Sequence, residues 1–554
     1  MELTLLFVGV CAALAAGYHF YGSFIAKKFL LNSRNQTPAA RVNDGVDFVP
    51  TPRFYLLGQH FSAIAAAGPI AGPILACQQF GWVPCLLWIG FGVIAIGAVH
   101  DLSTLVASIR HDARSIAEIV KTNMGPRAWL AMIGFIYIAL IYVIVAFADV
   151  TSSTFVAGDA ELKGLEFTFH PGGAVAAAST YYLILAFSMG FVEKLLKPPL
   201  WLQTLIFVPA TLGAVWCGTQ TSTYFVSDAK TWTLLILAYC FLSSLLPVWS
   251  LLQPRGYLGG FVLYFAIAAG LLGILFGGFA IQQPAFTQFS TGGDFGLLFP
   301  FLFVTIACGA CSGFHGLVCS GTTSKQIAKE EHCKSVGYGA MLLEALVAVI
   351  ALTTFMIATP SQIQGKGPGA IYGEGLGRFL TILLGEKNLT FATTFGAMAF
   401  STFVFDTLDV STRLGRILLQ EITGWKSKLG GVTLAAITCI IPGIFVWSSG
   451  AGSYRQFWTL FGTSNQLLAA LSLLGITVWL KRSGKDYRFT LFPMVFIFII
   501  TITALVIQMI APWTSASASS VVWVNSAVSF LLLLLSIAML TIGGKYLFTK
   551  SAKI

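Results

Sequence analysis

Charged side chains are scarce in this chain: Asp, Glu, Lys and Arg supply only 10% of its 554 residues. A typical soluble domain holds about 25% of these residues. Hydrophobic residues supply 56% of the sequence, far more than one core can hide behind a polar exterior. This composition excludes a single water-soluble globule and predicts a polytopic membrane protein, because a bilayer supplies apolar surroundings.

Features of several other protein classes are missing as well. The ten Cys residues lie mostly inside apolar runs, where they act as small hydrophobes, so no disulfide framework is expected. No GxxxxGK[ST] phosphate loop is present, which argues against an ATP-driven pump. The net charge of +10 is spread over loops, so no nucleic-acid partner is expected. The apolar start near 3–25 lacks a cationic segment and a cleavage site, and is predicted to be the first span.

Fifteen apolar runs are long enough for spanning helices, which need roughly 20 residues each. They lie near 3–26, 54–77, 84–108, 128–155, 173–190, 199–217, 231–251, 257–282, 296–321, 337–359, 389–411, 431–447, 457–480, 489–511 and 519–543. With the N-terminus outside and the C-terminus cytoplasmic, most of the 32 Lys and Arg residues fall in cytoplasmic loops, as the positive-inside rule requires. The outer loops then hold Lys163, Lys230, Lys366, Arg378, Lys387 and Arg455.

The second span contains two Gly-Pro pairs within six residues, at Gly68-Pro69 and Gly72-Pro73. Each proline removes a backbone donor, so this span is predicted to be a discontinuous helix, although a simple packing kink is the alternative. Half-helices that begin at membrane depth point their N-terminal amides at anionic substrates in secondary transporters. We therefore expect a substrate carboxylate at this break.

The seventh span is expected to be interrupted too, because Ser243, Ser244 and Pro247 lead into Arg255. It lies five spans after the second and runs in the opposite direction, as in inverted repeats. The sequence therefore predicts an all-α LeuT-type 5+5 fold with one helix before the repeats and about four after them. Residues 1–53 would hold the first span and a cytoplasmic loop, 54–217 and 231–420 the repeats, and 431–554 the last four spans.

Three stretches of the sequence resemble the CstA (carbon starvation) family. They are 44–51 followed by 58–73, then 312–325, and then 409–413 with Arg416 and Gln420 after it. The resemblance implies a bacterial inner-membrane protein that takes up short peptides or pyruvate-like carboxylates during carbon starvation. Gln59 departs from the pattern, since the family usually has a second His beside His60, and this puts any two-His mechanism in doubt.

The predicted substrate-binding residues are those of the helix break together with polar residues of the two longer motifs: His60, Gly68, Pro69, Gly72, Pro73, Ser312 and His315. His60 is a natural proton carrier near neutral pH and must face the protein interior; a structural hydrogen bond is the alternative. His315 shares one helical face with Cys308 and Cys311, but a single helix cannot supply the four ligands that zinc prefers, so no metal site is expected.

The coupling ion is expected to be a proton or sodium, with no other cofactor. The candidate residues for coupling are His60, Asp149, Thr305, Ser312 and Asp406. The hydroxyl groups suit a small cation, unless they bond their own helix backbone. A further set is predicted to form gates or structural pairs: Asp101, Ser320, Thr322, Thr323, Lys325, Glu344, Asp409 and Arg413. Within it, Asp409 and Arg413 are spaced to pair on one helix.

These features favour a secondary active transporter, not an enzyme, with a small-molecule substrate and the lipid bilayer as its surroundings. The oligomeric state stays open. Two other classes remain as alternatives. A membrane nutrient sensor without transport would normally carry a signalling domain. A haem or quinone oxidoreductase would need His pairs on facing helices.

Overall fold

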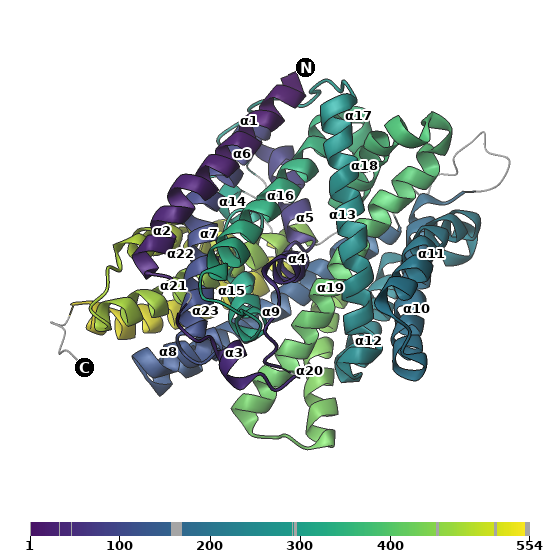
Figure 1. Ribbon diagram of the computed structural model, residues 1–554. Coiled ribbons are helices and arrows are strands. Elements are labelled where there is room, and N and C mark those ends of the chain that lie inside the picture. Colours follow the sequence, from purple (N-terminus) through teal and green to yellow (C-terminus); the bar gives the residue numbers. More distant parts are fainter. Residues whose placement is uncertain are drawn as a thin grey trace. The chain divides into compact units, whose positions relative to one another are not determined.

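A computed structural model describes residues 2–32, 34–45, 47–156, 169–290, 292, 296–449, 454–514 and 518–548 (Figure 1). Every extended regular element within these ranges is a helix, and the two isolated β-bridges form no strand. The all-α prediction is therefore confirmed. The predicted outer-loop residue Lys163 and the predicted cytoplasmic chain end at 549–554 lie outside the described residues.

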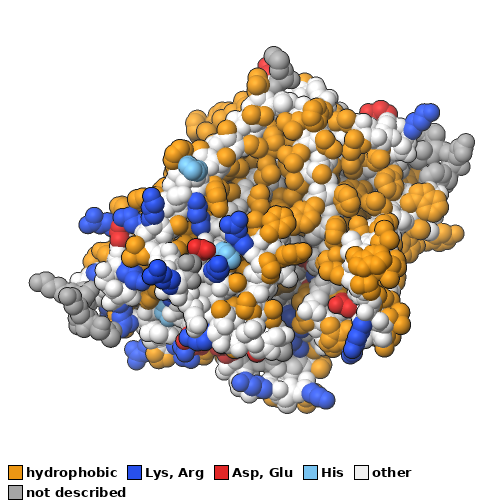
Figure 2. All heavy atoms as spheres, viewed as in Figure 1, with side chains coloured by type: hydrophobic (Ala, Val, Ile, Leu, Met, Phe, Trp, Pro, Cys, Tyr) orange, Lys and Arg blue, Asp and Glu red, His pale blue; other side chains and the backbone are white. Residues whose placement is uncertain are grey.

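Within the described residues, twelve helices are long and apolar enough to cross a membrane, and one bent helix pair forms a thirteenth candidate span. Each of the fifteen predicted runs contains helix. The seventh run is a shorter apolar helix, however, and the ninth is divided into two short helices. The multi-pass architecture is confirmed, whereas the count of fifteen spans stays a prediction. Hydrophobic side chains cover much of the face shown in Figure 2, as lipid-facing helices require.

The chain divides into two compact units. The first, here called the broken-helix unit, consists of Val8–Ala139, Ala285–Val349 and Trp458–Ile554. Its helices are α1 (Glu2–Ala16) from Val8, α2 (Gly22–Phe29), α3 (Pro38–Val42), α4 (Arg53–Ile64), α5 (Gly68–Phe80), α6 (Trp82–Gly92), α7 (Ala98–Ile109), α8 (Ile116–Met124), α9 (Pro126–Phe155) up to Ala139, α14 (Leu298–Thr305), α15 (Gly313–Gly321), α16 (Ala340–Met356) up to Val349, α21 (Tyr454–Arg482) from Trp458, α22 (Arg488–Thr514) and α23 (Ser520–Phe548).

The second, here called the Arg255 unit, consists of Met1–Phe7, Leu140–Pro284 and Ile350–Phe457. Besides the remaining parts of α1, α9, α16 and α21, its helices are α10 (Pro171–Leu196), α11 (Leu200–Gln220), α12 (Ala229–Leu245), α13 (Leu252–Phe276), α17 (Pro360–Ile363), α18 (Pro368–Leu384), α19 (Leu389–Thr423) and α20 (Lys428–Ser448). Within this unit α19 contacts α10, α12, α13, α18 and α20.

The predicted break in the second span is present. Helix α4 ends at Ile64, α5 begins at Gly68, and the two helices meet at 46°. The physical cause is Pro69, which lacks the N–H that would continue the helix by bonding the Ala65 carbonyl. Pro73 also lacks this donor, yet α5 continues through it. One of the two Gly-Pro pairs therefore breaks the span, and the other is tolerated inside a helix.

The second interruption of a predicted span lies elsewhere than the sequence indicates. The stretch from Ser243 to Arg255 contains the connection between two helices. Helix α12 ends at Leu245, and α13 begins at Leu252. The ninth predicted run is interrupted instead, because α14 ends at Thr305 and α15 begins at Gly313. The expectation of a broken seventh span is therefore wrong, and the proline there marks a helix connection.

The Gly-rich stretch at 365–377, which lies between two of the predicted spans, falls mostly in the helix α18. Its glycines lie against other helices at very short range: a Cβ on Gly373 would lie 2.8 Å from the Ala397 Cβ, and one on Gly377 would lie 2.6 Å from the Thr393 Oγ1. The glycines therefore allow α18 to pack closely on α19, which is the usual role of small residues at membrane helix contacts.

Candidate functional site

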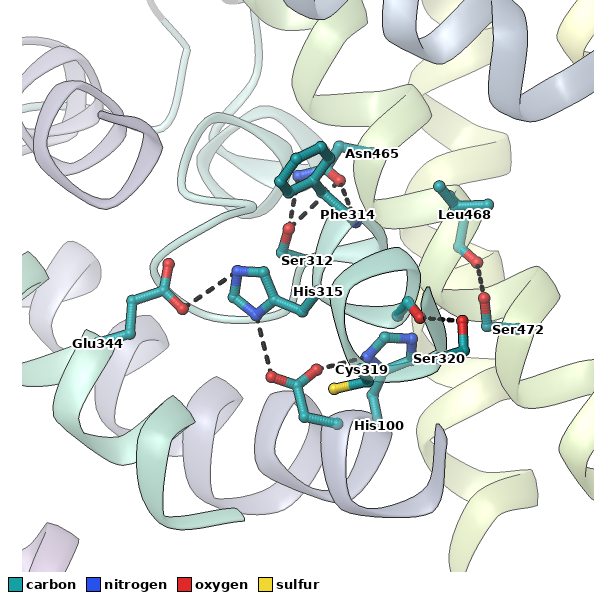
Figure 3. A network of polar contacts seen from close by, with 12 residues as sticks. His100, Ser312, Phe314, His315, Cys319, Ser320, Glu344, Asn465, Leu468 and Ser472 are labelled. Atoms are coloured by element: carbon teal, nitrogen blue, oxygen red, sulfur yellow. Dashed lines mark hydrogen bonds and ion pairs between the residues drawn. The ribbon is translucent and has the colours of Figure 1, made fainter. Parts of the chain in front are cut away.

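Four ionisable side chains form a buried network inside the broken-helix unit. His315 on α15 places its Nδ1 atom 3.0 Å from the Asp101 Oδ2 atom and its Nε2 atom 3.2 Å from the Glu344 Oε2 atom. Asp101 belongs to α7 and Glu344 to α16, so three helices meet at one imidazole. All three side chains are at most 2% exposed. Figure 3 shows His315 and Glu344 pointing toward each other.

His100 completes the network on the same helix as Asp101. Its Nδ1 atom lies 2.7 Å from the Asp101 Oδ1 atom, so both oxygens of Asp101 are bonded. Glu344 differs, because neither of its oxygens has a hydrogen-bond partner among the described residues, although Oε2 lies within ion-pair distance of His315. The His100 Nε2 atom also lacks a partner within those residues. The network therefore retains unused proton-binding capacity at Glu344 and at the outer nitrogen of His100.

Close backbone packing holds these helices together. A Cβ on Gly97, which precedes α7, would lie 2.2 Å from the Ala310 carbonyl oxygen. A Cβ on Gly316 would lie 3.2 Å from the Cε1 atom of His100. These glycines bring the segment before α15, and α15 itself, against the region of α7 that carries the site. The rigid approach fixes the His and Asp side chains at hydrogen-bonding distance.

His60 lies beside this network in the unit but takes a different partner. Its Nδ1 atom lies 2.8 Å from the Thr323 Oγ1 atom, and its Nε2 atom lies 3.7 Å from the Cys319 Sγ atom. The side chain is buried on α4, one turn before the break. This contact joins the first family-like motif to the second. The alternative interpretation of His60 expects a bond to a neighbouring carbonyl, whereas the partner here is the hydroxyl of a residue distant in the sequence.

The polar residues around the second interruption are held by α21. The Asn465 side chain accepts a hydrogen bond from the Phe314 amide at 2.9 Å and donates one to the Ser312 Oγ atom at 3.0 Å. Asn465 therefore satisfies an orphan N–H at the start of α15, in the manner of a helix cap. The Thr305 Oγ1 atom has no hydrogen-bond partner among the described residues.

The predicted carboxylate site at the start of α5 is buried and closely packed. A Cβ on Gly72 would lie 2.6 Å from the Thr305 carbonyl oxygen, so α5 and α14 approach at a point that admits only glycine. The Ile70 and Ala71 amides both bond to the Ala67 carbonyl oxygen. Pro69 has no amide proton. Fewer free amides therefore remain at this helix start than the sequence suggests.

Most of the chain matches one known protein family. The family model described as carbon starvation protein CstA matches residues 1–364 and 353–504. This chain belongs to the CstA family. The peptide transporter CstA of Bacillus subtilis (strain 168) is 33% identical, with 90% of this chain and 89% of the relative covered. The pyruvate/proton symporter BtsT of Escherichia coli (strain K12) is 31% identical, with 88% of this chain and 79% of the relative covered.

Solved structures with a related arrangement are more distant. A manganese transporter of Eremococcus coleocola is 13% identical, with a TM-score of 0.47 over 91% of this chain and 99% of that one. MhsT in complex with L-phenylalanine is 15% identical, with a TM-score of 0.43 over 88% of this chain and 97% of that one. At these TM-scores no feature of the CstA-family chain is assigned from either structure.

The remaining polar residues of the second CstA-family motif make local bonds. Ser320 donates to the Gly316 carbonyl oxygen and accepts from the Ile116 amide at 3.0 Å, which ties α15 to α8. Thr322 bonds its own helix at the Val318 carbonyl oxygen. The Lys325 ammonium lies 5.7 Å from the centre of the Phe48 ring. The role of these three residues as gates or structural pairs stays a prediction.

The third CstA-family motif lies in the Arg255 unit and forms a second buried charge cluster. The Arg255 guanidinium lies 2.5 Å from the Asp406 Oδ1 atom and 2.7 Å from the Asp409 Oδ2 atom. Asp409 also accepts hydrogen bonds from Tyr239 and Ser243. Arg255 is fully buried, whereas the Asp406 side chain is 23% exposed. The two carboxylates thus share one cation on α13.

The predicted ion pair between Asp409 and Arg413 is wrong. Arg413 donates instead to the carbonyl oxygens of Ser243 and Leu246, at 3.1 and 2.7 Å. Both carbonyls belong to the C-terminal end of α12, where a cation is favourable because the last carbonyls lack helix partners. Arg255, which comes from another helix, takes the carboxylate.

Asp149 belongs to neither cluster. It lies on α9 in the Arg255 unit, is buried, and accepts a hydrogen bond from the Tyr454 amide. Its Oδ2 atom has no hydrogen-bond partner among the described residues. Thus four of the predicted site residues, Asp149, Asp406, Asp409 and Arg413, lie in the Arg255 unit, and the others lie in the broken-helix unit.

Two residues with central contacts were not predicted as site residues. Asn465 lies in a polar run, Thr463 to Gln466, within an apolar span, and intramembrane polar residues of this kind are a usable signal. Arg255 falls between the predicted spans 231–251 and 257–282, so the sequence predicts a cytoplasmic loop cation there. No group of three or more His, Cys, Asp or Glu residues in the described part of the chain is placed to hold a metal ion.

Proposed function

We propose that this protein is a secondary active transporter of the bacterial inner membrane that imports small carbon nutrients by proton symport. The observation that carries the proposal is His315, placed between two buried carboxylates in a family whose named relatives are transporters. The relatives are named for peptides and for pyruvate with protons. Both substrate classes present a carboxylate. The N-terminus is proposed to lie outside and the C-terminus in the cytoplasm.

The proton inventory of the network supports coupling to protons. A neutral imidazole has one N–H and one lone pair, yet both His315 nitrogens face carboxylate oxygens. With both carboxylates ionised, the imidazole must carry two protons, which leaves the group of three with one net negative charge. A buried net charge is costly. A further proton, bound at Glu344, would remove it.

Glu344 is the group best placed to bind and release that proton. Asp101 already accepts bonds at both oxygens, from His100 and His315. The Glu344 Oε1 atom has no hydrogen-bond partner among the described residues, so ionised Glu344 is less well stabilised than ionised Asp101. The titratable groups that face it are His315, Asp101 and Cys308. The proton would therefore exchange between Glu344 and the substrate pathway.

Sodium coupling is the second candidate for the driving ion. It would use hydroxyl and carbonyl oxygens near the helix breaks, and the Thr305 hydroxyl is unbonded within the described residues. Ser312, however, is already bonded to Asn465. The described contacts therefore favour the proton over sodium.

The interruptions in α4/α5 and α14/α15 are proposed to mark the first helices of two inverted units. In the proposed topology the second and ninth spans run in opposite directions, as such units require. The second inverted repeat, which is not the same as the Arg255 unit, would then begin near 298, whereas the sequence predicts its start at 231. The substrate carboxylate is proposed to lie near the α5 start at Gly68, with His60 in the preceding half-helix.

Uptake into proteoliposomes tests the proposed function. Labelled pyruvate and a labelled dipeptide are each offered under an imposed proton gradient, an imposed sodium gradient, or no gradient. The proposal predicts accumulation of one of them with the proton gradient. Substrate binding without uptake in any condition would favour a sensor. Haem or quinone absorbance in the purified protein would favour the oxidoreductase alternative.

A further inference from the structure

An apolar groove lies on the broken-helix unit, and none of the four network residues lines it. Its volume is about 380 Å³, and it opens to the surface. One wall is formed by Leu14 on α1 and Tyr18 on the π-helical turn that follows, and the other by Leu342 and Leu343 on α16. Leu57 of α4 also lines it. Leu343 is 38% exposed, so the groove is lined by side chains suited to a lipid chain.

Two basic side chains, Lys334 and Arg53, lie beside Tyr18, which lines the groove. The Lys334 ammonium lies 4.3 Å from the centre of the Tyr18 ring and 2.8 Å from the Ser23 Oγ atom. Ser335, the next residue, lines the groove with its side chain half-buried. Arg53 interacts electrostatically with Tyr18. The groove therefore pairs an apolar length with cations at the side where the proposed topology places the cytoplasm.

More charge gathers beside these two cations. His332 interacts electrostatically with Arg53, Lys329 and Glu331, so two cations and one carboxylate lie near it in addition to Lys334. The local balance is positive. Figure 2 shows Lys and Arg side chains near the lower end of α2, and hydrophobic side chains over α1 above them. A basic pocket between spanning helices at the cytoplasmic side is the pattern that recognises anionic lipid headgroups.

We propose that this groove binds an anionic phospholipid, with one acyl chain between α1 and α16 and the phosphate at Lys334. An apolar groove alone would accept the chain of any membrane lipid. The cations beside Tyr18 select a headgroup with net negative charge over a zwitterionic one. The ligand class is therefore a phosphatidylglycerol-like or cardiolipin-like lipid.

Occupancy of the groove would act on the broken span. Leu57 contacts the groove from α4, the half-helix that also carries His60. His60 is bonded to Thr323 beyond α15. A lipid chain against Leu57 would brace α4 on its outer side, so the bound lipid favours the conformation in which the His60–Thr323 bond is made.

The test measures binding of phosphatidylglycerol and phosphatidylcholine to the detergent-solubilised full chain by native mass spectrometry. Lys334→Gln removes the headgroup cation, and Leu343→Trp fills the chain-binding part of the groove. Lys334→Gln should weaken phosphatidylglycerol binding by about fivefold, as for one lost basic contact, and Leu343→Trp should weaken it by filling the space for the chain. Lys334→Gln should not alter phosphatidylcholine binding to a comparable extent. Lys426→Gln, at an exposed loop of the Arg255 unit, is the matched control and should bind as the unchanged protein does.

Glycerol phosphate, which has the headgroup charge but no chains, should fail to displace the lipid. Equal affinity for the two phospholipids, or unchanged phosphatidylglycerol binding in both variants, would overturn the proposal. Size-exclusion profiles show whether each variant is folded. Should Lys334→Gln not fold, Arg53→Gln replaces it with the same expected loss, and an unchanged affinity there would equally overturn the proposal.

Discussion

The Nε2 atom of His315 lies 3.2 Å from the Oε2 atom of Glu344, and both side chains are buried. The two residues come from different helices, α15 and α16, and the opposite ring nitrogen is bonded to Asp101. A histidine held between two carboxylates cannot be described by one residue's protonation. Its proton belongs to the whole group, and a change at Glu344 is therefore felt at Asp101.

Gly72→Ala should destabilise the protein and abolish uptake. Its Cβ would lie 2.6 Å from the Thr305 carbonyl oxygen, and backbone cannot move aside cheaply. Overpacking of this kind costs about 1–3 kcal/mol. Thermal unfolding in detergent measures the loss. Gly134→Ala is the matched control, because a Cβ there meets nothing within 4 Å; equal melting temperatures for the two variants would contradict the close approach of α5 and α14.

Arg255→Met should lower stability strongly, because Asp406 and Asp409 would lose their shared cation. Removing one partner of a buried ion pair costs about 3–5 kcal/mol. Adding Asp406→Asn and Asp409→Asn to Arg255→Met should restore part of the loss, since no unpaired charge then remains. Chemical unfolding of the unchanged protein, Arg255→Met and the triple variant gives the comparison. If the triple variant were less stable than Arg255→Met alone, unpaired carboxylate charge would not be the cause of the lost stability.

Glu330 should make the protein sensitive to acid. Burial tends to raise the pKa of Glu330, but hydrogen bonds from Arg110, the Asn32 amide and Asn35, with the Arg110 charge, outweigh it and hold the pKa below 4.5. The unfolded chain therefore takes up a proton at a higher pH than the folded one. The stability from these bonds is present above about pH 4.5 and is lost as the pH falls through the lower, folded pKa.

Glu330→Gln should flatten the acid limb of the stability curve, which is the fall in stability as the pH drops below about 4.5. Melting temperatures recorded from neutral pH to below 4.5 test it, with Glu331→Gln, at the exposed neighbouring residue, as the control. The Gln variant should be less stable at neutral pH and should lose less on acidification. An unchanged acid limb would place the titrating group elsewhere.

Much of the fold was predictable because its signals are local. The apolar runs predict the spans. Pro69 predicts the break between α4 and α5, because its missing N–H removes a hydrogen bond from the helical turn in which it lies. The motif residues His60 and Thr323 proved to be partners. The break between α14 and α15 was not predictable in the same way, because no proline marks 306–312.

The errors came from partners distant in the sequence. Helical spacing pairs Asp409 with Arg413. A rule based on spacing within one helix cannot predict the contact between Arg255 and Asp406, which lie 151 residues apart in the sequence. The same applies to Glu344 and Asp101, which were predicted as separate gate or structural residues. Only tertiary packing brings them to one imidazole, so the network as a unit had no sequence signature.

Proton-driven uptake by Glu344→Gln tests the central claim most directly. Proteoliposomes with either protein are compared in two modes: accumulation under an imposed proton gradient, and exchange of labelled for unlabelled substrate without a gradient. We predict that Glu344→Gln retains exchange but loses accumulation, while Glu331→Gln keeps both. Accumulation by Glu344→Gln equal to that of the unchanged protein, with the same pH dependence, would contradict the account and remove Glu344 from the coupling pathway.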